Sequence, residues 1–203
     1  IYDLVKAGVQ VSKNKDAFYV KHSAASADIL AKAAVKTQAL SALPADVSCQ
    51  IGTKRIGLWD TYGGSMPSGW LRWILEQHHF DFTLVFAKEI DKGNLRSKFD
   101  VLIFVKGAIP GLKPEPVSEW DEKEPVESEI PAEYQETMGK ITASKSVPAL
   151  RAFLEEGGDI ITIGSSANLA YHLNLPVKNA LVEMVAGKER SEEHTSELQS
   201  RLQ

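Results

Sequence analysis

The chain has 203 residues, of which 43% are hydrophobic and 25% charged, and these proportions exclude disordered, collagen-like and disulfide-scaffold proteins. Its 23 basic and 27 acidic residues give a net charge of −4, which argues against a nucleic-acid partner because duplex-binding surfaces carry a basic excess. The longest apolar run, residues 101–105, is far shorter than the roughly 18 residues of a membrane span, and the single cysteine, Cys49, excludes an internal disulfide.

The first unit, residues 1–50, is predicted to be a small α/β segment. In chain order we expect a helix end, short extended segments, an alanine-rich helix and a linker, at residues 2–9, 9–20, 26–43 and 44–54.

The second unit, residues 55–185, alternates strands with helices. Strands are expected at residues 55–59, 82–86, 100–105, 159–163 and 180–185, and helices at residues 69–79, 147–156 and 166–173. Ser146 is expected to cap the helix that follows it. The alternation predicts an α/β fold: a flavodoxin-like parallel sheet with helices on both faces.

Three tryptophans surround the first strand and helix of this unit. In the helix, Trp70, Trp73, Ile74 and Gln77 share one stripe. Together with Trp59, the tryptophans are interpreted as core or interface residues rather than as a platform for a stacked ligand.

An acidic insert, residues 111–136, separates the third strand from the next helix. Nine acidic residues and one basic residue lie between residues 115 and 136. We interpret the insert as a solvated surface excursion; the alternative is a lid or a docking surface for a basic partner.

The loop after the first strand is glycine-rich. Gly63, Gly64, Ser65 and Ser68 precede a helix, and backbone N–H groups in such a loop favour an anion. The spacing is neither GxGxxG nor that of a P-loop. The alternative is a turn that needs glycine for tight packing of strand on helix.

A second strand–turn–helix junction contains Gly164, Ser165 and Ser166. A nucleophile elbow places a serine or cysteine at such a turn, but the GxSxG pattern fails at Asn168. His172 is the nearest base in the sequence. The favoured interpretation is that Ser165 or Ser166 caps the following helix.

The histidines give no metal-site pattern. His78 and His79 are adjacent, and adjacent side chains on a helix diverge by about 100°. Before the C-terminal residues 190–203, in which His194 and Glu197 have the HxxE spacing, no HxxE or HExxH pair occurs, so we expect no zinc site in this chain.

Both ends of the chain suggest a piece of a longer protein. The first residue is Ile1 and no signal peptide precedes the first unit. Residues 190–203 are interpreted as an artefactual tail, because residues 190–200 match the translation of a common sequencing adapter. The tail is then expected to make few contacts and to leave Leu198 and Leu202 outside the core.

Four stretches carry a family resemblance. They are RIGLWDTYGGSMPSGWLRWILEQ (55–77), IDKGNLRSKFDVLIFVKGAIP (90–110), IPAEYQETMGKIT (130–142) and VPALRAFLEEGGDIITIGSSANLAYHLNLPVKNALVE (147–183). In this order they resemble the C-terminal region of large bacterial zinc carboxypeptidases of the carboxypeptidase A type. In those proteins a class I glutamine-amidotransferase-like α/β domain follows the catalytic domain.

The resemblance implies an accessory role. The zinc ligands and the catalytic Glu of the family belong to the upstream domain, so this chain is expected to hold no cofactor. The nucleophile position of glutamine amidotransferases falls on Gly164, which has no side chain. The implied function is a non-catalytic accessory domain that contacts the carboxypeptidase domain in cis, within an exported parent protein.

Two alternatives stay open. One is a serine hydrolase that uses Ser165 or Ser166, and the other is an anion- or sugar-binding module built on residues 63–69. A binding site shared by both glycine turns requires Gly63, Gly64 and Gly164 to follow adjacent parallel strands. An interaction domain is instead expected to expose a contiguous apolar patch.

Overall fold

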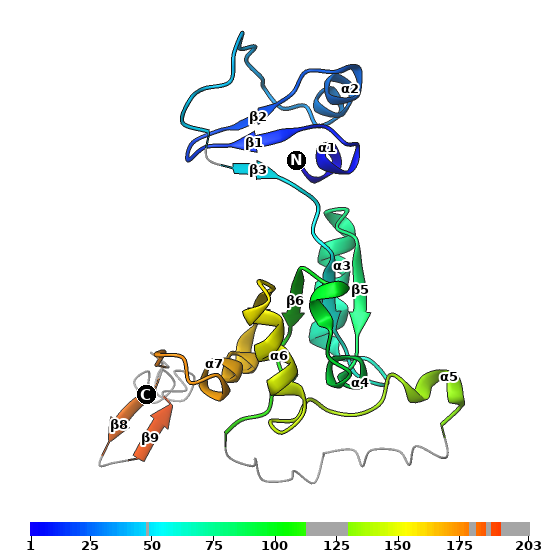
Figure 1. Ribbon diagram of the computed structural model, residues 1–203, viewed down its shortest axis with the longest axis vertical. Helices are drawn as coiled ribbons and strands as arrows, with labels where there is room; N and C mark the ends of the chain where they lie inside the picture. The colour runs from blue at the N-terminus through cyan, green and yellow to red at the C-terminus, as the bar shows by residue number, and fades with distance from the viewer. Residues whose placement is uncertain (48, 113–129, 179–181, 186–187, 192–203) are drawn as a thin grey trace, which may run out of the picture.

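The computed structural model describes residues 1–47, 49–112, 130–178, 182–185 and 188–191. Within these ranges the chain forms an antiparallel three-stranded sheet, a parallel four-stranded sheet and an antiparallel two-stranded sheet (Figure 1). None of the helices in these ranges combines the length and apolar character that crossing a bilayer requires.

The N-terminal unit is the small α/β segment expected from the sequence. Its elements are α1 (Tyr2–Lys6), β1 (Val11–Lys13), β2 (Phe18–Val20), α2 (Ala24–Lys32) and β3 (Cys49–Ile51). The central strand β1 pairs antiparallel with β2 and with β3. Leu4 and Val11 are its fully buried apolar side chains. Strand β3 lies inside the stretch expected to be a linker.

Helix α2 is shorter than expected. It begins with a reciprocal capping box between Ser23 and Ser26 and ends at Lys32, 11 residues before the expected end at residue 43. Beyond it, the side chains of Val35, Leu40 and Leu43 are more than half exposed. A helix there would bury no apolar face, and most of the stability of a protein helix comes from such burial.

The second unit has the expected flavodoxin-like α/β fold. Its elements are β4 (Ile56–Trp59), α3 (Met66–Gln77), β5 (Phe82–Val85), α4 (Ala87–Asp91), the 3-10 helix η1 (Leu95–Ser97), β6 (Val101–Phe104), α5 (Ala132–Gln135), α6 (Ser146–Glu155), β7 (Asp159–Thr162), the 3-10 helix η3 (Gly164–Ala167) and α7 (Asn168–His172). The strands are parallel and their order is β5-β4-β6-β7. The strand order therefore reverses at β4: β5 lies on one side of it, and the later strands β6 and β7 lie on the other side.

Helices cover the two faces of this sheet unequally. Helix α3 packs on β4, whereas α6 packs on β7 and contacts both α4 and η1. Leu58, Ile103 and Ile161 lie in register on the α3 face and are 0%, 7% and 48% exposed. Helix α3 therefore covers the centre of its face and leaves β7 open.

Gly57 leaves room for side chains of the two strands that flank β4 in the sheet, Leu102 of β6 and Val85 of β5. A Cβ atom at this position would lie 2.6 Å from Leu102 Cδ2 and 2.8 Å from Val85 Cγ2. Both side chains are nearly fully buried, so any larger residue would displace the core.

An ion cluster joins the starts of β4 and β6. The Arg55 guanidinium and backbone N–H both donate to Asp100, at 2.9 Å from Nη2 and 2.8 Å from the amide, and Arg96 also donates to this carboxylate. These hydrogen bonds hold the pKa of Asp100 well below its usual range.

Helix α6 begins differently from the expectation. Its N-cap is Lys145, without a side-chain cap, and Ser146 is its first residue. The Ser146 hydroxyl donates to Asp91 at 2.6 Å and accepts from the Thr142 N–H at 2.9 Å. Ser146 therefore ties α6 to α4 instead of capping it.

The last strand does not join the parallel sheet. Strand β8 (Val182–Val185) pairs antiparallel with β9 (Lys188–Ser191). The first two residues of the interpreted tail, Arg190 and Ser191, lie in β9. Residues 192–203, including Leu198 and Leu202, and residues 113–129 of the acidic insert lie outside the described residues.

The two units meet where α1 approaches the turn between α3 and β5. The Tyr2 and Phe80 rings stack with centroids 4.3 Å apart. Lys6 pairs with Asp81 at 2.8 Å, and His79 Nδ1 lies 3.0 Å from Asp3 Oδ1. Apart from this contact, the chain passes between the units at residues 52–55, which are exposed or nearly so.

Candidate functional site

The strand order places the candidate site at the carboxyl ends of β4 and β6. In open α/β sheets of this order, ligands bind outside the carboxyl ends of the strands at the point where the order reverses. Three segments meet this edge: residues 60–65 after β4, residues 105–109 after β6, and residues 163–167 after β7.

A buried carboxylate closes the glycine-rich loop. Asp60 is 4% exposed, and its Oδ1 accepts hydrogen bonds from the Thr61 and Ser65 N–H groups, each at 2.9 Å. Gly63 and Gly64 both adopt left-handed backbone angles, with φ of +78° and +77°. The loop therefore folds around a negative charge of its own.

The backbone N–H groups in the first turn of α3 also donate to acceptors within that turn. Ser65 is the N-cap, and its hydroxyl accepts from the Ser68 N–H at 3.3 Å. Pro67 has no N–H, and the Gly69 N–H donates to the Ser65 carbonyl. Most donors that an anion needs are thus engaged, and the Asp60 charge opposes an anion at this loop.

Helix α3 begins three residues earlier than expected. The sequence signal for this start is a serine followed two positions later by a proline, the usual pattern of an N-cap and first turn. Asp60 was missed as a site residue, although an aspartate directly after a strand and before a glycine turn often accepts from nearby backbone N–H groups.

Ser68 is fully buried, and its hydroxyl has no hydrogen-bond partner within the described part of the chain. The buried Nε1 atom of Trp59 likewise has no hydrogen-bond partner among the described residues. Ser68 therefore lies on the buried side of α3 rather than on the loop surface, and a ligand at the loop has no direct path to it.

In the turn after β7, the left-handed backbone position typical of a nucleophile elbow is occupied by Gly164, which has no nucleophilic side chain. Gly164 has φ of +63°, and a Cβ atom there would lie 3.3 Å from Lys106 Cβ. The residue at the sharpest point of the turn thus carries no reactive atom.

Ser165 and Ser166 bind the loop after β6. The Ser165 hydroxyl accepts from the Gly107 N–H at 3.0 Å. The Ser166 hydroxyl is fully buried, donates to the Val105 carbonyl and accepts from the Ile109 N–H at 3.3 Å. The expected helix cap is wrong: neither η3 nor α7 has a side-chain cap.

His172 does not form a catalytic pair with either serine. Its Nε2 lies 2.9 Å from the Pro110 carbonyl, which fixes this nitrogen as a donor. Across the described ranges, no hydrogen bond joins a histidine to Ser165 or Ser166.

The two glycine turns lie at the same end of the sheet but do not follow adjacent strands. Gly63 and Gly64 follow β4 and Gly164 follows β7, and β6 lies between these strands. The expectation of adjacent strands is therefore wrong. The Lys106–Gly107 segment, which contacts the Gly164 turn, separates them.

The histidines do not converge. His78 is exposed at the end of α3, and His79 turns toward Asp3 of α1. In the residues that the structure describes, no three His, Cys, Asp or Glu side chains come together as metal ligands.

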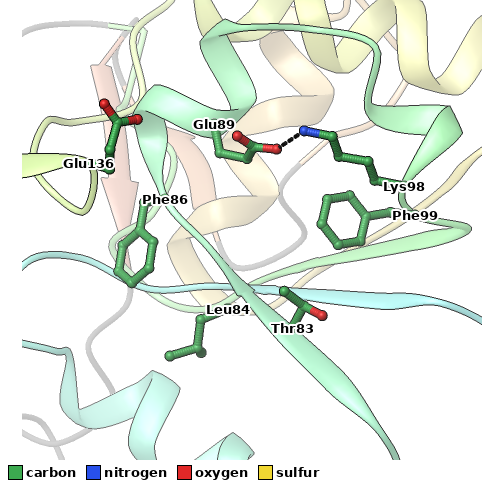
Figure 2. Close-up of a pocket in the computed structure, with 7 residues that line it drawn as sticks. All are labelled: Thr83, Leu84, Phe86, Glu89, Lys98, Phe99 and Glu136. Atoms are coloured by element: carbon green, nitrogen blue, oxygen red, sulfur yellow. Dashed lines mark hydrogen bonds and ion pairs between the residues drawn. The ribbon is translucent and has the colours of Figure 1, made fainter. Parts of the chain in front are cut away.

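Two shallow depressions lie beside the edge strand β5. One, of about 400 Å³, lies between β5 and the α4–η1 segment (Figure 2). The other, of about 490 Å³, reaches from β5 to Tyr2 and Lys6 of the N-terminal unit. The charges of the first are neutralised, because Glu89 pairs with Lys98, as the dashed line in Figure 2 shows, and Glu136 pairs with Lys92 at 2.6 Å. Neither depression touches the two glycine turns.

A comparison with models of known protein families, with curated proteins and with solved structures found no significant match.

Proposed function

We propose that residues 55–185 form a non-catalytic accessory domain of a zinc carboxypeptidase, which acts through contact with the catalytic domain of the same polypeptide. The observation that carries this proposal is the use of Ser165 and Ser166 as structural ligands of the loop after β6. The family resemblance supplies the parent activity, peptide hydrolysis, and places its zinc and general base in the upstream domain.

The serine hydrolase alternative requires a free hydroxyl and a base. A nucleophilic serine must deliver its proton to an adjacent histidine or similar group. The Ser166 hydroxyl instead donates a hydrogen bond to the Val105 carbonyl inside the core, and the Ser165 hydroxyl accepts one from the Gly107 N–H. This bonding favours the accessory role.

The anion- or sugar-binding alternative requires free N–H groups at the loop of residues 63–69. The Asp60 carboxylate and the Ser65 hydroxyl already accept from the donors nearest to α3. The loop is therefore better suited to hold strand β4 against α3 than to bind an anion.

The proposal is tested first at the chemical level. The purified 203-residue chain is treated with a fluorophosphonate probe, in parallel with Ser165→Ala and Ser166→Ala. We expect no covalent labelling of any of the three. Labelling that Ser165→Ala or Ser166→Ala abolishes would establish the hydrolase alternative instead.

The parent activity is tested by extending the coding sequence upstream of Ile1. We expect an in-frame His-x-x-Glu motif. With the longer protein in hand, deletion of residues 55–189 is expected to leave bound zinc in place while altering stability or peptide KM. A reading frame that contains no such motif would contradict the proposal.

A further inference from the structure

Two surfaces of the second unit are open to solvent: the outer side of α3 and the free edge of β5. On α3, Trp70 and Trp73 are 63% and 54% exposed, which excludes the core interpretation for these two side chains. An apolar surface alone does not specify a partner. The edge of β5 does, because it combines unpaired backbone groups, two depressions and an unequal distribution of charge.

The backbone of β5 is paired on one side only. In the described part of the chain, β5 is the first strand of the parallel sheet and pairs with β4 alone. The Val85 carbonyl accepts from the Asp60 N–H, so it points toward β4. Because backbone groups alternate in direction along a strand, the N–H and C=O groups of Phe82 and Leu84 point away from β4. Two donors and two acceptors are therefore open to a further strand.

The two depressions form one groove along this edge. Thr83, Lys98 and Phe99 line both of them. In an extended segment, side chains two positions apart lie on the same face, about 6.8 Å from one another. An extended segment paired with β5 therefore places one side chain at each depression.

The two depressions differ in chemistry. The one beside α4 has the apolar surfaces of Leu84, Phe86 and Phe99, and its charges are paired (Figure 2). The one beside the N-terminal unit has four basic side chains and one acidic side chain, which are Lys6, Lys54, Arg55, Lys98 and Asp81. Three of these bases pair with carboxylates, whereas Lys54 forms no ion pair among the described residues. The first depression thus suits an apolar side chain and the second a carboxylate.

Both ends of the groove are bounded. Tyr2 and Lys6 of the N-terminal unit lie near the start of β5, and Glu136, just after α5, lies near the other end. A second copy of β5 paired antiparallel would bring its own N-terminal unit to the end where Glu136 lies. A single extended peptide has no such bulk, so the groove favours a peptide over a second copy of this chain.

We propose that β5 binds an extended peptide as an additional edge strand. The peptide places an apolar side chain in the depression beside α4 and, two residues later, a carboxylate side chain in the depression beside the N-terminal unit. This order follows from an antiparallel direction, which is slightly more stable per residue and is common for edge strands of otherwise parallel sheets. Main-chain hydrogen bonds supply affinity, and the two side chains supply selectivity. The proposal goes beyond the accessory role and does not depend on it.

The pairing of the peptide with β5 follows from this arrangement. The residue between the apolar and acidic side chains lies opposite Leu84; its N–H donates to the Leu84 carbonyl, and its carbonyl accepts from the Leu84 N–H. The residue after the acidic one pairs in the same way with Phe82. The N–H group of the apolar residue points away from β5.

The first experiment tests the main-chain hydrogen bonds. A fluorescein-labelled Thr-Thr-Thr-Phe-Thr-Glu-Thr amide is titrated with the 203-residue chain, and its fluorescence anisotropy is measured. We expect a Kd of about 10–100 μM, because the contact is smaller than a standard interface. N-methylation of the threonine between phenylalanine and glutamate is expected to weaken binding at least about tenfold, since it removes a donor to Leu84. N-methylation of the phenylalanine is the control and is expected to leave the Kd within about twofold.

The second experiment tests the charge. Lys54→Glu is expected to weaken binding about fivefold, and a peptide with lysine in place of glutamate is expected to recover that loss on this variant. Lys36→Glu is the matched control, because Lys36 is exposed in the loop after α2 and lines neither depression. A peptide in which phenylalanine and glutamate are exchanged tests the direction and is expected to bind about fivefold more weakly.

Several outcomes would overturn the proposal. They are no binding up to about 1 mM, equal effects of the two N-methyl groups, equal effects of Lys54→Glu and Lys36→Glu, and equal binding of the exchanged peptide. Sedimentation velocity of the chain alone is expected to show a monomer. A dimer that the peptide does not dissociate would assign the edge to a second copy and overturn the proposal as well.

Discussion

Two serines of the second unit share a residue type and a degree of burial but differ in bonding. Ser68 and Ser166 are both 0% exposed. The Ser166 hydroxyl joins Val105 and Ile109, 61 and 57 residues away, whereas the Ser68 hydroxyl has no partner within the described chain. A short stretch of sequence can predict that a serine caps a helix a few residues away. It contains no information on partners as distant as Val105 and Ile109. That is why Ser165 or Ser166 was expected to cap the helix that follows the turn.

Ser68→Ala and Ser166→Ala are expected to change stability in opposite ways. Removing an unpartnered buried hydroxyl relieves its desolvation cost, so Ser68→Ala should leave the free energy of unfolding unchanged or raise it. Ser166→Ala leaves a buried carbonyl and N–H unpaired and should lower it by about 1–3 kcal/mol. Urea denaturation followed by circular dichroism measures both; a loss for Ser68→Ala comparable to that for Ser166→Ala would contradict the bonding described here.

At the scale of elements, the strands of the parallel sheet were predicted to within about one residue at each end. A continuous apolar run bounded by charged or turn residues, as at residues 100–105, locates a buried strand directly. Helix ends were predicted less well, because α2 ends where burial ends and α3 begins at a serine cap. The partner of the last strand could not be predicted, since strand pairing depends on contacts that a local pattern does not contain.

The hydrogen bonds to Asp100, which join the starts of β4 and β6, make the free energy of unfolding depend on pH. The pKa of Asp100 is lowered in the folded chain, so its stabilising effect is complete above the unfolded pKa of about 4 and is lost as the pH falls below that value. The free energy of unfolding should therefore decrease on acidification in this range. Asp100→Asn should remove that part of the decrease and cost roughly 1–3 kcal/mol at neutral pH.

The matched control for Asp100 is Asp28→Asn. Asp28 also pairs with a basic residue, Lys32, at 2.8 Å, but its side chain is 64% exposed. Exposed pairs contribute little, so this variant should keep the acid dependence of the unchanged chain. Parallel denaturation series from pH 7 downward distinguish the two; equal profiles for both variants would show that the cluster does not govern acid stability.

At the scale of the whole molecule, the sequence predicted two units and a flavodoxin-like second unit, but not how the units meet. The alternation of strands and helices determines the layers, whereas the contact between α1 and the turn after α3 joins residues about 75 positions apart. Both glycine turns were predicted at the carboxyl ends of parallel strands, and they lie there, after β4 and β7. The hydrogen bonds from the first loop to Asp60 depend on loop geometry and were not foreseen.

The contact between the units predicts their proteolytic sensitivity. Phe80→Ala removes the ring that stacks on Tyr2 and should increase the rate of tryptic cleavage at Lys54 about fivefold, the factor that a loss of roughly 1 kcal/mol gives. Phe18→Ala, which changes an exposed ring that does not contact Tyr2, is the control and should cleave at the original rate. Equal rates for Phe80→Ala and the unchanged chain would indicate that the stack does not hold the units together.

Strand β7 forms one edge of the parallel sheet in the described chain; Ile161 within it and Ile163 just after it are exposed. An edge strand offers unpaired backbone groups to any extended segment that reaches it, and natural edges are usually blunted by charge, proline or a bulge. Within β7 the only charged residue is Asp159, at the start of the strand. During refolding at high protein concentration, the edge of β7 is therefore open to pairing between molecules, and the yield of soluble protein will depend on how quickly that edge is covered.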